Sequence, residues 1–474
     1  MTAPLREADV ALLLEGTYPF VRGGVSAWVH HLIEALPELR FSLVFLGGRR
    51  SDHSAPAYQL PRNVVHFERH YLFEREERPR RKDCVIDSAL LEQMAATFGQ
   101  VLSRESFLRG DASWQRICER YRQDCPAASF TDFFWTMRAT HLPLFAVAEI
   151  AAQLPPARFY HSLSTGYAGL LGALLQKRQG RPLVLTEHGI YTKERMIDLA
   201  SADSFPGDGA EGEAVGRRLW MQLFQGLGKI AYSSANPIIA LYNGNRKRQI
   251  EDGAEPAHTR IIPNGVEVDR FRKLRALRPP SPPPVIGFIG RVVPIKDVKT
   301  FIRAMKAIVA ERPEVEGWII GPTSEDEAYA AECRQLVASL GLESNVKFLG
   351  FQKPEEILHR LGLLVLTSIS EALPLVVLEA FASGLPVLTT DVGACRELVE
   401  GRTAEDRALG AAGAVVSIAD SGAAARAALA LLRDPARWRT AQRAAIRRVE
   451  AHYTEPQMIE AYRQIYREAA SWRA

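Results

Sequence analysis

The stretch Ser370–Pro386, SEALPLVVLEAFASGLP, predicts the fold of the chain more clearly than any other. An apolar run, Leu363–Leu366, precedes it and has the length and composition of a buried parallel strand. Pro374 suits the first position of a helix, and the closing GLP sequence stops that helix before the next apolar run, Val387–Thr390. The order strand, loop, helix, strand is the repeating unit of an open α/β sheet.

Two glutamates of this stretch lie where such a sheet binds ligands. Glu371 falls in the loop after the first strand, and Glu379 lies on the helix eight residues later. Ligands of open α/β sheets bind beyond the carboxyl ends of the strands, and helix N-termini attract anions. The pair therefore suits a ligand that carries both phosphate and hydroxyl groups. For an E-x7-E pair on its own, two solvated surface glutamates remain the alternative.

Length and composition indicate a globular protein of more than one domain. The 474 residues are too many for a single core, which predicts two domains or three. A net charge of +4 gives no argument for a nucleic-acid partner. The five cysteines form no C-x2-C pair, so we expect a reducing compartment. A charged N-terminus and the lack of an apolar run of about 20 residues predict a cytoplasmic protein.

The second half contains a proline-rich run and two cations ahead of a helix. Residues 278–284, RPPSPPP, can continue neither a helix nor a central strand, so they predict a domain boundary. After the next apolar strand, Gly290 opens a loop in which Arg291 and Lys296 precede a helix that begins at Val298. Cations at a helix N-terminus oppose the helix dipole unless an anion lies between. The two cations therefore predict an anion-binding site.

The first half offers a glycine pair, a histidine and a helical region. Gly23 and Gly24 link a strand to an amphipathic helix, and paired glycines let the backbone approach a ligand closely. His188 follows an apolar strand directly. A structural role for the glycines, and for the histidine, remains the alternative. From about residue 70 to 143, charged runs lead into aromatic-rich helical stretches. We interpret this region as a helical insertion that serves as scaffold or binds an acceptor or partner.

Taken together, the motifs resemble those of the family 4 retaining glycosyltransferases, which have the GT-B fold. The E-x7-E pair, the G-R-x-x-x-x-K sequence at Gly290–Lys296, the T-x-H at Thr186–His188 and the glycine loop carry the resemblance, although Asp297 replaces the usual glycine. The resemblance implies an α/β protein with two Rossmann-like domains that face each other across a cleft. The implied parts are an N-terminal acceptor domain (1–277, with the insertion at about 70–143), a linker (278–284), a nucleotide-sugar donor domain (285–450) and a final helix (451–474) that crosses back to the first domain.

The resemblance also implies roles for single residues. Glu371 would contact the hydroxyls of the donor sugar, and Glu379 would contact those of the ribose. Arg291 and Lys296 would hold the diphosphate, and His188 would position the transferred sugar. The implied catalytic residues are His188, Arg291, Lys296 and Glu371. The implied donor-binding residues are Gly23, Gly24, Gly290, Phe351, Pro374, Leu375 and Glu379.

The implied activity is transfer of a sugar from a UDP-sugar to a growing polysaccharide with retained anomeric configuration. The chain contains no D-x-D motif, so we expect the two cations to stabilise the leaving diphosphate without a metal ion or cofactor.

Residues 9–33, DVALLLEGTYPFVRGGVSAWVHHLI, are similar to the cytosolic glycosyltransferases of Pel exopolysaccharide biosynthesis. This implies a polysaccharide acceptor and an inner-membrane synthase complex as partners, with recruitment to the inner membrane face. The alternatives are a UDP-sugar 2-epimerase of the same fold and a catalytically idle scaffold of the synthase complex.

Overall fold

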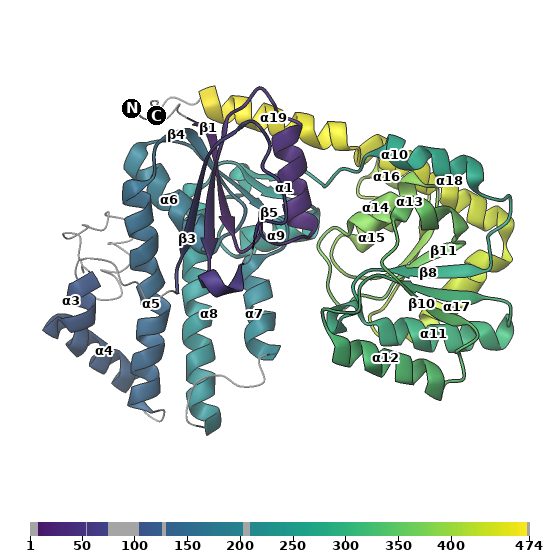
Figure 1. Ribbon diagram of the computed structural model, residues 1–474, viewed down its shortest axis with the longest axis horizontal. Helices are drawn as coiled ribbons and strands as arrows, with labels where there is room; N and C mark the ends of the chain where they lie inside the picture. Colours follow the sequence, from purple (N-terminus) through teal and green to yellow (C-terminus); the bar gives the residue numbers. More distant parts are fainter. Residues whose placement is uncertain (1–7, 54, 74–103, 126–128, 202–208, 472–474) are drawn as a thin grey trace. The chain divides into compact units, whose positions relative to one another are not determined.

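The computed structural model describes residues 8–53, 55–73, 104–125, 129–201 and 209–471. The chain forms two compact units, which are described separately below (Figure 1). The first unit contains the residues up to Ala240, then Arg246–Ile261, then the residues from Tyr462 on. The second unit contains Leu241–Asn245 and Ile262–Ala461.

The first unit is built on a seven-stranded parallel sheet with the strand order β3-β2-β1-β4-β5-β6-β7. Its strands are β1 (Ala8–Glu15), β2 (Phe41–Gly47), β3 (Val64–Tyr71), β4 (Ala157–Ser162), β5 (Leu183–Glu187), β6 (Ile238–Ala240) and β7 (Thr259–Ile261). Its helices are α1 (Gly24–Glu34), η1 (Arg50–Asp52), α3 (Arg104–Arg109), α4 (Asp111–Asp124), α5 (Phe130–Gln153), α6 (Tyr167–Gln179), α7 (Tyr191–Ser201), α8 (Gly209–Ser234), most of α9 (Asn243–Glu251) and η2 (Pro256–His258).

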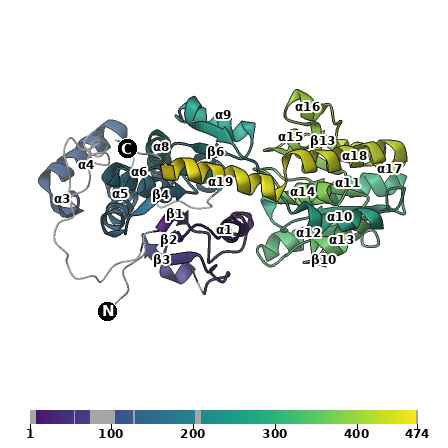
Figure 2. The ribbon, with the colours of Figure 1, turned by 90° about the horizontal axis from the view of Figure 1, so that it is seen from above.

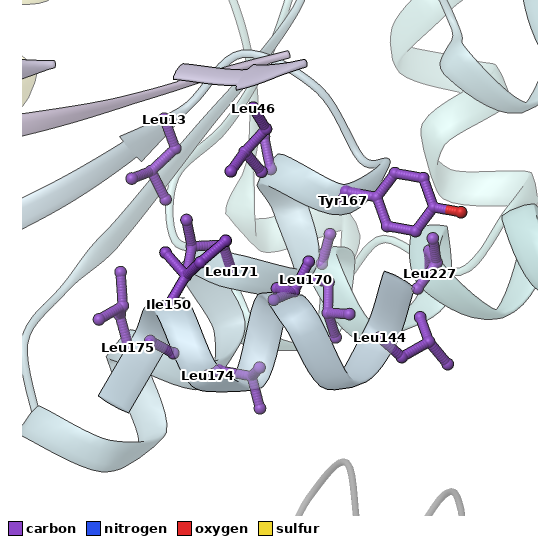
Figure 3. Packing of buried hydrophobic residues seen from close by; sticks show 14 of the residues in the cluster. Leu13, Leu46, Leu144, Ile150, Tyr167, Leu170, Leu171, Leu174, Leu175 and Leu227 are labelled. Atoms are coloured by element: carbon purple, nitrogen blue, oxygen red, sulfur yellow. The ribbon is translucent and has the colours of Figure 1, made fainter. Parts of the chain in front are cut away.

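Helices cover both faces of this sheet, which explains why β1, ADVALLLE, is apolar on both sides. On one face, Leu13 and Leu46 contact the apolar side of α6, which packs between the sheet and helices α5 and α8 (Figure 3). On the other face lie α1 and the end of the last helix, α19 (Glu455–Ser471), whose Tyr466 packs against Phe159 of β4. The carboxyl ends of β1, β4 and β5 are therefore held from both sides.

The second unit contains a six-stranded parallel sheet with the order β10-β9-β8-β11-β12-β13. Its strands are β8 (Val285–Ile289), β9 (Glu316–Ile320), β10 (Val346–Gly350), β11 (Leu363–Leu366), β12 (Val387–Thr390) and β13 (Gly413–Val416). Its helices are α10 (Val268–Arg272), η3 (Lys273–Leu277), η4 (Pro294–Lys296), α11 (Val298–Glu311), α12 (Glu327–Ser339), α13 (Pro354–Ile357), η5 (Leu358–Arg360), α14 (Leu375–Ala382), α15 (Cys395–Glu400), α16 (Ala404–Arg407), α17 (Ser421–Arg433), α18 (Pro435–His452) and the start of α19.

Alternate residues of these strands enter two different cores. Phe288 and Val365 pack with α11, α12 and α17, whereas Leu364 and Leu366 pack with α14 and α18. Aspartate side chains cap four of the longer helices by accepting hydrogen bonds from backbone N–H groups of the first turn. The capping residues are Asp297, Asp326, Asp420 and Asp434, at α11, α12, α17 and α18. Both sheets thus have the parallel, doubly covered architecture expected from the sequence.

The division between the units differs from the predicted boundary at residues 278–284. The proline-rich run lies inside the second unit, and residues 262–277, expected in the first domain, also belong there. Phe271 and Leu274 are buried in the core of the second unit. Arg278 is half-buried and donates to the carbonyl oxygens of Ser383 and Leu361 at 2.7 and 2.9 Å. These contacts hold the proline-rich run in the second unit, so the local sequence signal was misleading.

Part of the predicted insertion, residues 74–103, lies outside the described residues. Within the described part, α3, α4 and α5 fall in or begin in the predicted range, and α5 continues to Gln153. Residues 64–71, where no strand was expected, form β3 at the edge of the sheet. Among the described residues, no helix is both long enough and apolar enough to span a bilayer.

Candidate functional site

The strand order of each sheet defines where a ligand is expected. In both units the chain reverses its direction of winding, between β1 and β4 in the first and between β8 and β11 in the second. Loops leave the carboxyl ends of such strands in opposite directions and leave room for a ligand. In the second unit these loops begin at Gly290 and Thr367.

Close backbone contact fixes the loop that begins at Gly290. Gly321, which follows β9, has a φ of 147°, and a Cβ atom added there would lie 1.9 Å from the carbonyl oxygen of Gly290. Only glycine fits that position, because both the conformation and the contact exclude a side chain. The ends of β8 and β9 therefore meet directly beneath the predicted anion site.

Asp297, where the related motif has glycine, adopts a left-handed conformation with a φ of 42°. Aspartate is one of the few residues other than glycine that tolerate this region. Its side chain also accepts a hydrogen bond from the backbone N–H of Thr300 at 3.2 Å, so it caps α11. The departure from the motif therefore preserves the turn and adds a helix cap.

Lys296 and Glu371, both predicted as site residues, lie in direct contact. The Nζ atom of Lys296 donates to Oε1 of Glu371, and the hydroxyl of Ser368 donates to the same oxygen at 2.6 Å. The backbones of the two loops are also joined, because Thr367 Oγ1 donates to the carbonyl oxygen of Asp297 at 2.9 Å. The structure thus brings together a cation and a carboxylate beside the start of α11.

Arg291 has a different acidic partner. Its guanidinium, on a side chain that is 53% exposed, pairs with Glu325, which follows β9. The sequence analysis did not select Glu325, although its position two residues after a G-P-T strand end is a detectable signal. The two predicted cations are therefore held by separate carboxylates of the same unit.

Glu379 is partly buried on α14. This helix begins at Leu375, so Pro374 is its N-cap and not its first helical residue. Burial raises the pKa of its carboxyl to about 7, with the charge of Glu355 adding to the rise and that of Arg270 opposing it. Phe351, in contrast, is 74% exposed just beyond β10.

Gly393 is a site residue that the sequence analysis missed. Its φ is 54°, and a Cβ atom added there would lie 2.2 Å from the carbonyl oxygen of Glu371. The neighbouring N–H of Ala394 donates to the carbonyl oxygen of Ala372 at 2.8 Å. The loop after β12 therefore supports the loop that carries Glu371.

In the first unit, His188 directly follows β5 and is 9% exposed. Its ring packs edge-on against Trp28 of α1, with a centroid distance of 4.7 Å. Burial lowers the pKa of His188 to about 4, so the imidazole is neutral at physiological pH. No hydrogen-bond partner for the buried Nε2 atom occurs in the described part of the chain. This nitrogen is available to a ligand hydroxyl.

Behind His188 lies a hydrogen-bonded network that the sequence analysis did not foresee. The Nδ1 atom of His161 lies 2.7 Å from the hydroxyl of Tyr466, and its Nε2 atom lies 2.9 Å from Oγ1 of Thr186. Tyr462 contacts the same threonine oxygen at 3.2 Å and packs edge-on against Trp28. The last helix thus supports both Trp28 and the strand that precedes His188.

The predicted glycine loop leads into α1 of the first unit. Gly23 and Gly24 are exposed, and a Cβ atom added at either would meet nothing within 4 Å. Packing within the described residues therefore does not require glycine there, whereas close approach of a ligand to the helix N-terminus would. Nearby, Glu15 at the end of β1 accepts hydrogen bonds from Tyr191 and Ser164 at 2.7 and 3.0 Å. Glu15 thus fixes the loop after β4 at the point between β1 and β4 where the chain reverses its direction of winding.

Comparison with family models identifies the family of the chain. Two overlapping segments, residues 8–89 and 77–257, match the family described as "Domain of unknown function (DUF3492)" and together span more than half of the chain. The chain belongs to the DUF3492 family. In this DUF3492 protein, residues 283–434 match a second model, described as "Glycosyl transferases group 1". The second unit therefore carries the group 1 glycosyltransferase domain.

Curated relatives of this DUF3492 chain include D-inositol 3-phosphate glycosyltransferases. The enzyme of Streptomyces scabiei is 29% identical over 252 residues, which are 50% of this chain and 53% of the relative. That of Acidothermus cellulolyticus is 28% identical over 272 residues, which are 53% of this chain and 57% of the relative. The chain thus spans little more than half the length of these relatives.

Solved structures share the fold of this DUF3492 protein. Anabaena HepE in complex with UDP and glucose is 17% identical, with a TM-score of 0.60 over 98% of this chain and 100% of that one. Sucrose-phosphate synthase from Thermosynechococcus elongatus is 18% identical, with a TM-score of 0.59 over 98% and 99% of the two chains. The fold is GT-B, as the resemblance implied.

Proposed function

We propose that the chain is a retaining glycosyltransferase that moves a sugar from a UDP-sugar to a polysaccharide acceptor without a metal ion. The contact between Lys296 and Glu371 at the switch point of the second unit carries this proposal. The match to Glycosyl transferases group 1 over residues 283–434 supports it. The UDP and glucose bound to Anabaena HepE support the choice of donor.

The cations of the second unit suit the leaving group. Transfer breaks the bond between the anomeric carbon and a β-phosphate oxygen, on which negative charge develops. Lys296, Arg291 and the first backbone N–H groups of α11 would stabilise this charge. Their counter-charges, Glu371 and Glu325, keep them in place before the donor arrives.

The carboxylates suit the hydroxyl groups of the donor. Glu371, held by Ser368 and Lys296, would accept hydrogen bonds from hydroxyls of the sugar. Glu379 would accept them from the ribose. An acceptor hydroxyl forms the new bond to the anomeric carbon on the face that the phosphate leaves, and its proton passes to the departing phosphate. Retention of configuration follows from attack on that face.

Residues of the first unit would position the sugars. His188, neutral and with its Nε2 atom unpartnered in the described part of the chain, can exchange a hydrogen bond with a sugar hydroxyl without adding charge. Gly23 and Gly24 leave room beside the N-terminus of α1. We further propose that the acceptor is an exopolysaccharide of the Pel type and that a membrane-bound synthase complex recruits the enzyme to the inner membrane face. The resemblance of residues 9–33 supports this assignment.

Calorimetric titration of UDP, ADP, GDP and NAD in the presence of a chelator tests the proposal. We expect binding of UDP alone, weakened at least about tenfold in Lys296→Ala because one charge-assisted contact to phosphate is lost. Lys299→Ala is the matched control, since Lys299 lies on α11 but pairs with Glu332 at the surface. Preference for another nucleotide would overturn the UDP donor, and absence of all nucleotide binding would overturn the catalytic assignment in favour of a scaffold.

A second experiment separates transfer from epimerisation. The protein is incubated with a panel of UDP-sugars, and the nucleotide products are identified by NMR. A transferase releases UDP as an acceptor is glycosylated or as the donor is slowly hydrolysed. Conversion of a UDP-sugar into its 2-epimer would contradict the proposal and identify an epimerase of the same fold.

A further inference from the structure

Glu379 lies among charged residues from two other helices of the second unit. Arg270 is on α10, which packs against α14, and Glu355 is on α13. Apolar residues of these three helices share one buried cluster, to which Phe271, Ile357 and Leu378 belong. Figure 2 shows the three helices close together. The carboxyl of Glu379 therefore has a fixed electrostatic environment.

Arg270 and Glu355 form an ion pair with defined geometry. The Nε atom of Arg270 donates to Oε1 of Glu355. The guanidinium also lies over the ring of Phe271, 5.2 Å from its centroid. The second carboxylate oxygen of Glu355 is buried and has no hydrogen-bond partner within the described residues. The negative charge of Glu355 is thus only partly compensated.

We propose that Arg270 and Glu355 are positioning residues that set the charge of Glu379 and thereby make recognition of the nucleotide ribose depend on pH near neutrality. This inference rests on the proposed function, because it requires a ribonucleoside diphosphate in the second unit. Arg270 and Glu355 act on Glu379 through their charges, and no contact between them and the ligand is part of the inference.

The charges around Glu379 act in opposite directions. Burial raises its pKa to about 7, the positive charge of Arg270 lowers it, and the negative charge of Glu355 raises it. Two further groups influence the partners of Glu379. Glu267 contributes to the raised pKa of Arg270, and Lys273 contributes to the lowered pKa of Glu355. Burial is the largest influence on the pKa of Glu379, and the two charges of the ion pair adjust it in opposite directions.

Only the ionised carboxylate recognises a ribose fully. It accepts hydrogen bonds from both hydroxyls of a vicinal diol, whereas a protonated carboxyl carries a hydrogen on one oxygen and loses that acceptor. If the ionised form is the competent one, the apparent affinity falls with its population. From about pH 8 to about pH 6, a group with a pKa of about 7 loses roughly tenfold in that population.

Calorimetry with UDP and 2′,3′-dideoxy-UDP isolates this effect on the full-length protein. The two ligands share the same titrating diphosphate, so the ratio of their dissociation constants cancels the contribution of the phosphate. In the wild type we expect UDP to be favoured over the dideoxy compound by about tenfold more at pH 8 than at pH 6. Glu379→Gln should make the ratio independent of pH.

The two partner residues should shift the midpoint of this profile in opposite directions. Arg270→Gln removes the positive charge, so the midpoint should rise and the preference for UDP should require a higher pH. Arg270→Lys retains the charge and should restore the wild-type midpoint. Glu355→Gln removes the negative charge, so the midpoint should fall. Lys347→Gln is the control, because Lys347 pairs with Glu316 at the surface.

A purely structural role for the pair would weaken both ligands alike and leave the midpoint unchanged. That result, or shifts of both variants in the same direction, would overturn the inference. If wild-type protein binds UDP but not in a ribose-dependent way, the inference fails and the proposed donor stands. If wild-type protein binds no UDP at any pH, the proposed function itself fails, and the inference with it.

Discussion

Lys296 and Glu371 form an ion pair whose side chains are only 19% and 10% exposed. The two residues are 75 positions apart in the sequence and come from the turn before α11 and the loop after β11. Because water screens a partly buried pair less than a surface pair, the contact is stronger than an exposed salt bridge. It fixes the loops of the second unit before any ligand binds.

A double-mutant cycle should measure this coupling. We expect Lys296→Met and Glu371→Gln each to reduce the free energy of unfolding by about 1–3 kcal/mol, because each leaves a partly buried partner unpaired. The double variant should lose less than the sum of the two. Urea denaturation provides the measurement, and strictly additive losses would contradict a direct contact.

The dual role of Asp297 can be separated by two substitutions. In Asp297→Ala the left-handed conformation is strained and the helix cap is lost, so stability should fall by about 1–2 kcal/mol. In Asp297→Gly the cap is lost but the strain disappears, so stability should change by less than about 0.5 kcal/mol. Equal urea midpoints for the two variants would show that the backbone conformation is not the deciding factor.

Gly393→Ala should weaken nucleotide-sugar binding more than its effect on stability suggests. The added methyl group would collide with the backbone at Glu371 and displace that side chain. Gly341→Ala is the matched control, since Gly341 also has a positive φ, 62°, but open space around its Cβ position. Both variants bear the conformational cost of about 1–2 kcal/mol. Calorimetry should show reduced donor affinity only for Gly393→Ala; equal affinities would remove Gly393 from the site.

Acid should destabilise the first unit through its buried histidines. Burial lowers the pKa of His188 to about 4 and, together with the charge of His188, that of His161 to about 3. An unfolded chain protonates both near pH 6.5. The unfolded state therefore binds more protons below about pH 6.5, and stability falls as the pH decreases from there. His188→Gln should show a smaller loss of stability between about pH 7 and pH 5 than the wild type. An identical loss would mean that His188 is not held neutral.

The central strands were predictable because they are buried on both faces. The predicted bounds of β11 and β12 agree with the structure, since short, largely apolar runs mark these buried strands. Strands β3, β7 and β13, which were not predicted, lie at sheet edges. In β3, VVHFERHY, histidines and charges alternate with apolar residues, so no apolar run marks the strand.

Residues of the candidate site could be predicted where a single charged or polar side chain carries the proposed chemistry. Lys296, Glu371 and His188 were predicted in the segments that follow β8, β11 and β5, and the structure places them there. Gly393 and Glu325 were not predictable, because they matter through contacts with loops that are distant in the sequence. The change from one unit to the other was missed for a similar reason. Its position is set by which core Phe271 enters, and the sequence around it has no distinctive composition.

Tyr462 and Tyr466 complete the core of a unit whose sheet ends at Ile261. During synthesis the first unit therefore cannot reach its final form when its sheet has left the ribosome, because Tyr462 and Tyr466 are translated some 200 positions later. The second unit, in contrast, needs nothing beyond Ala461. The half of the chain that is made first is completed last, so a ribosome-bound nascent chain should hold His188 in an unfinished setting until the last helix, α19, has been made.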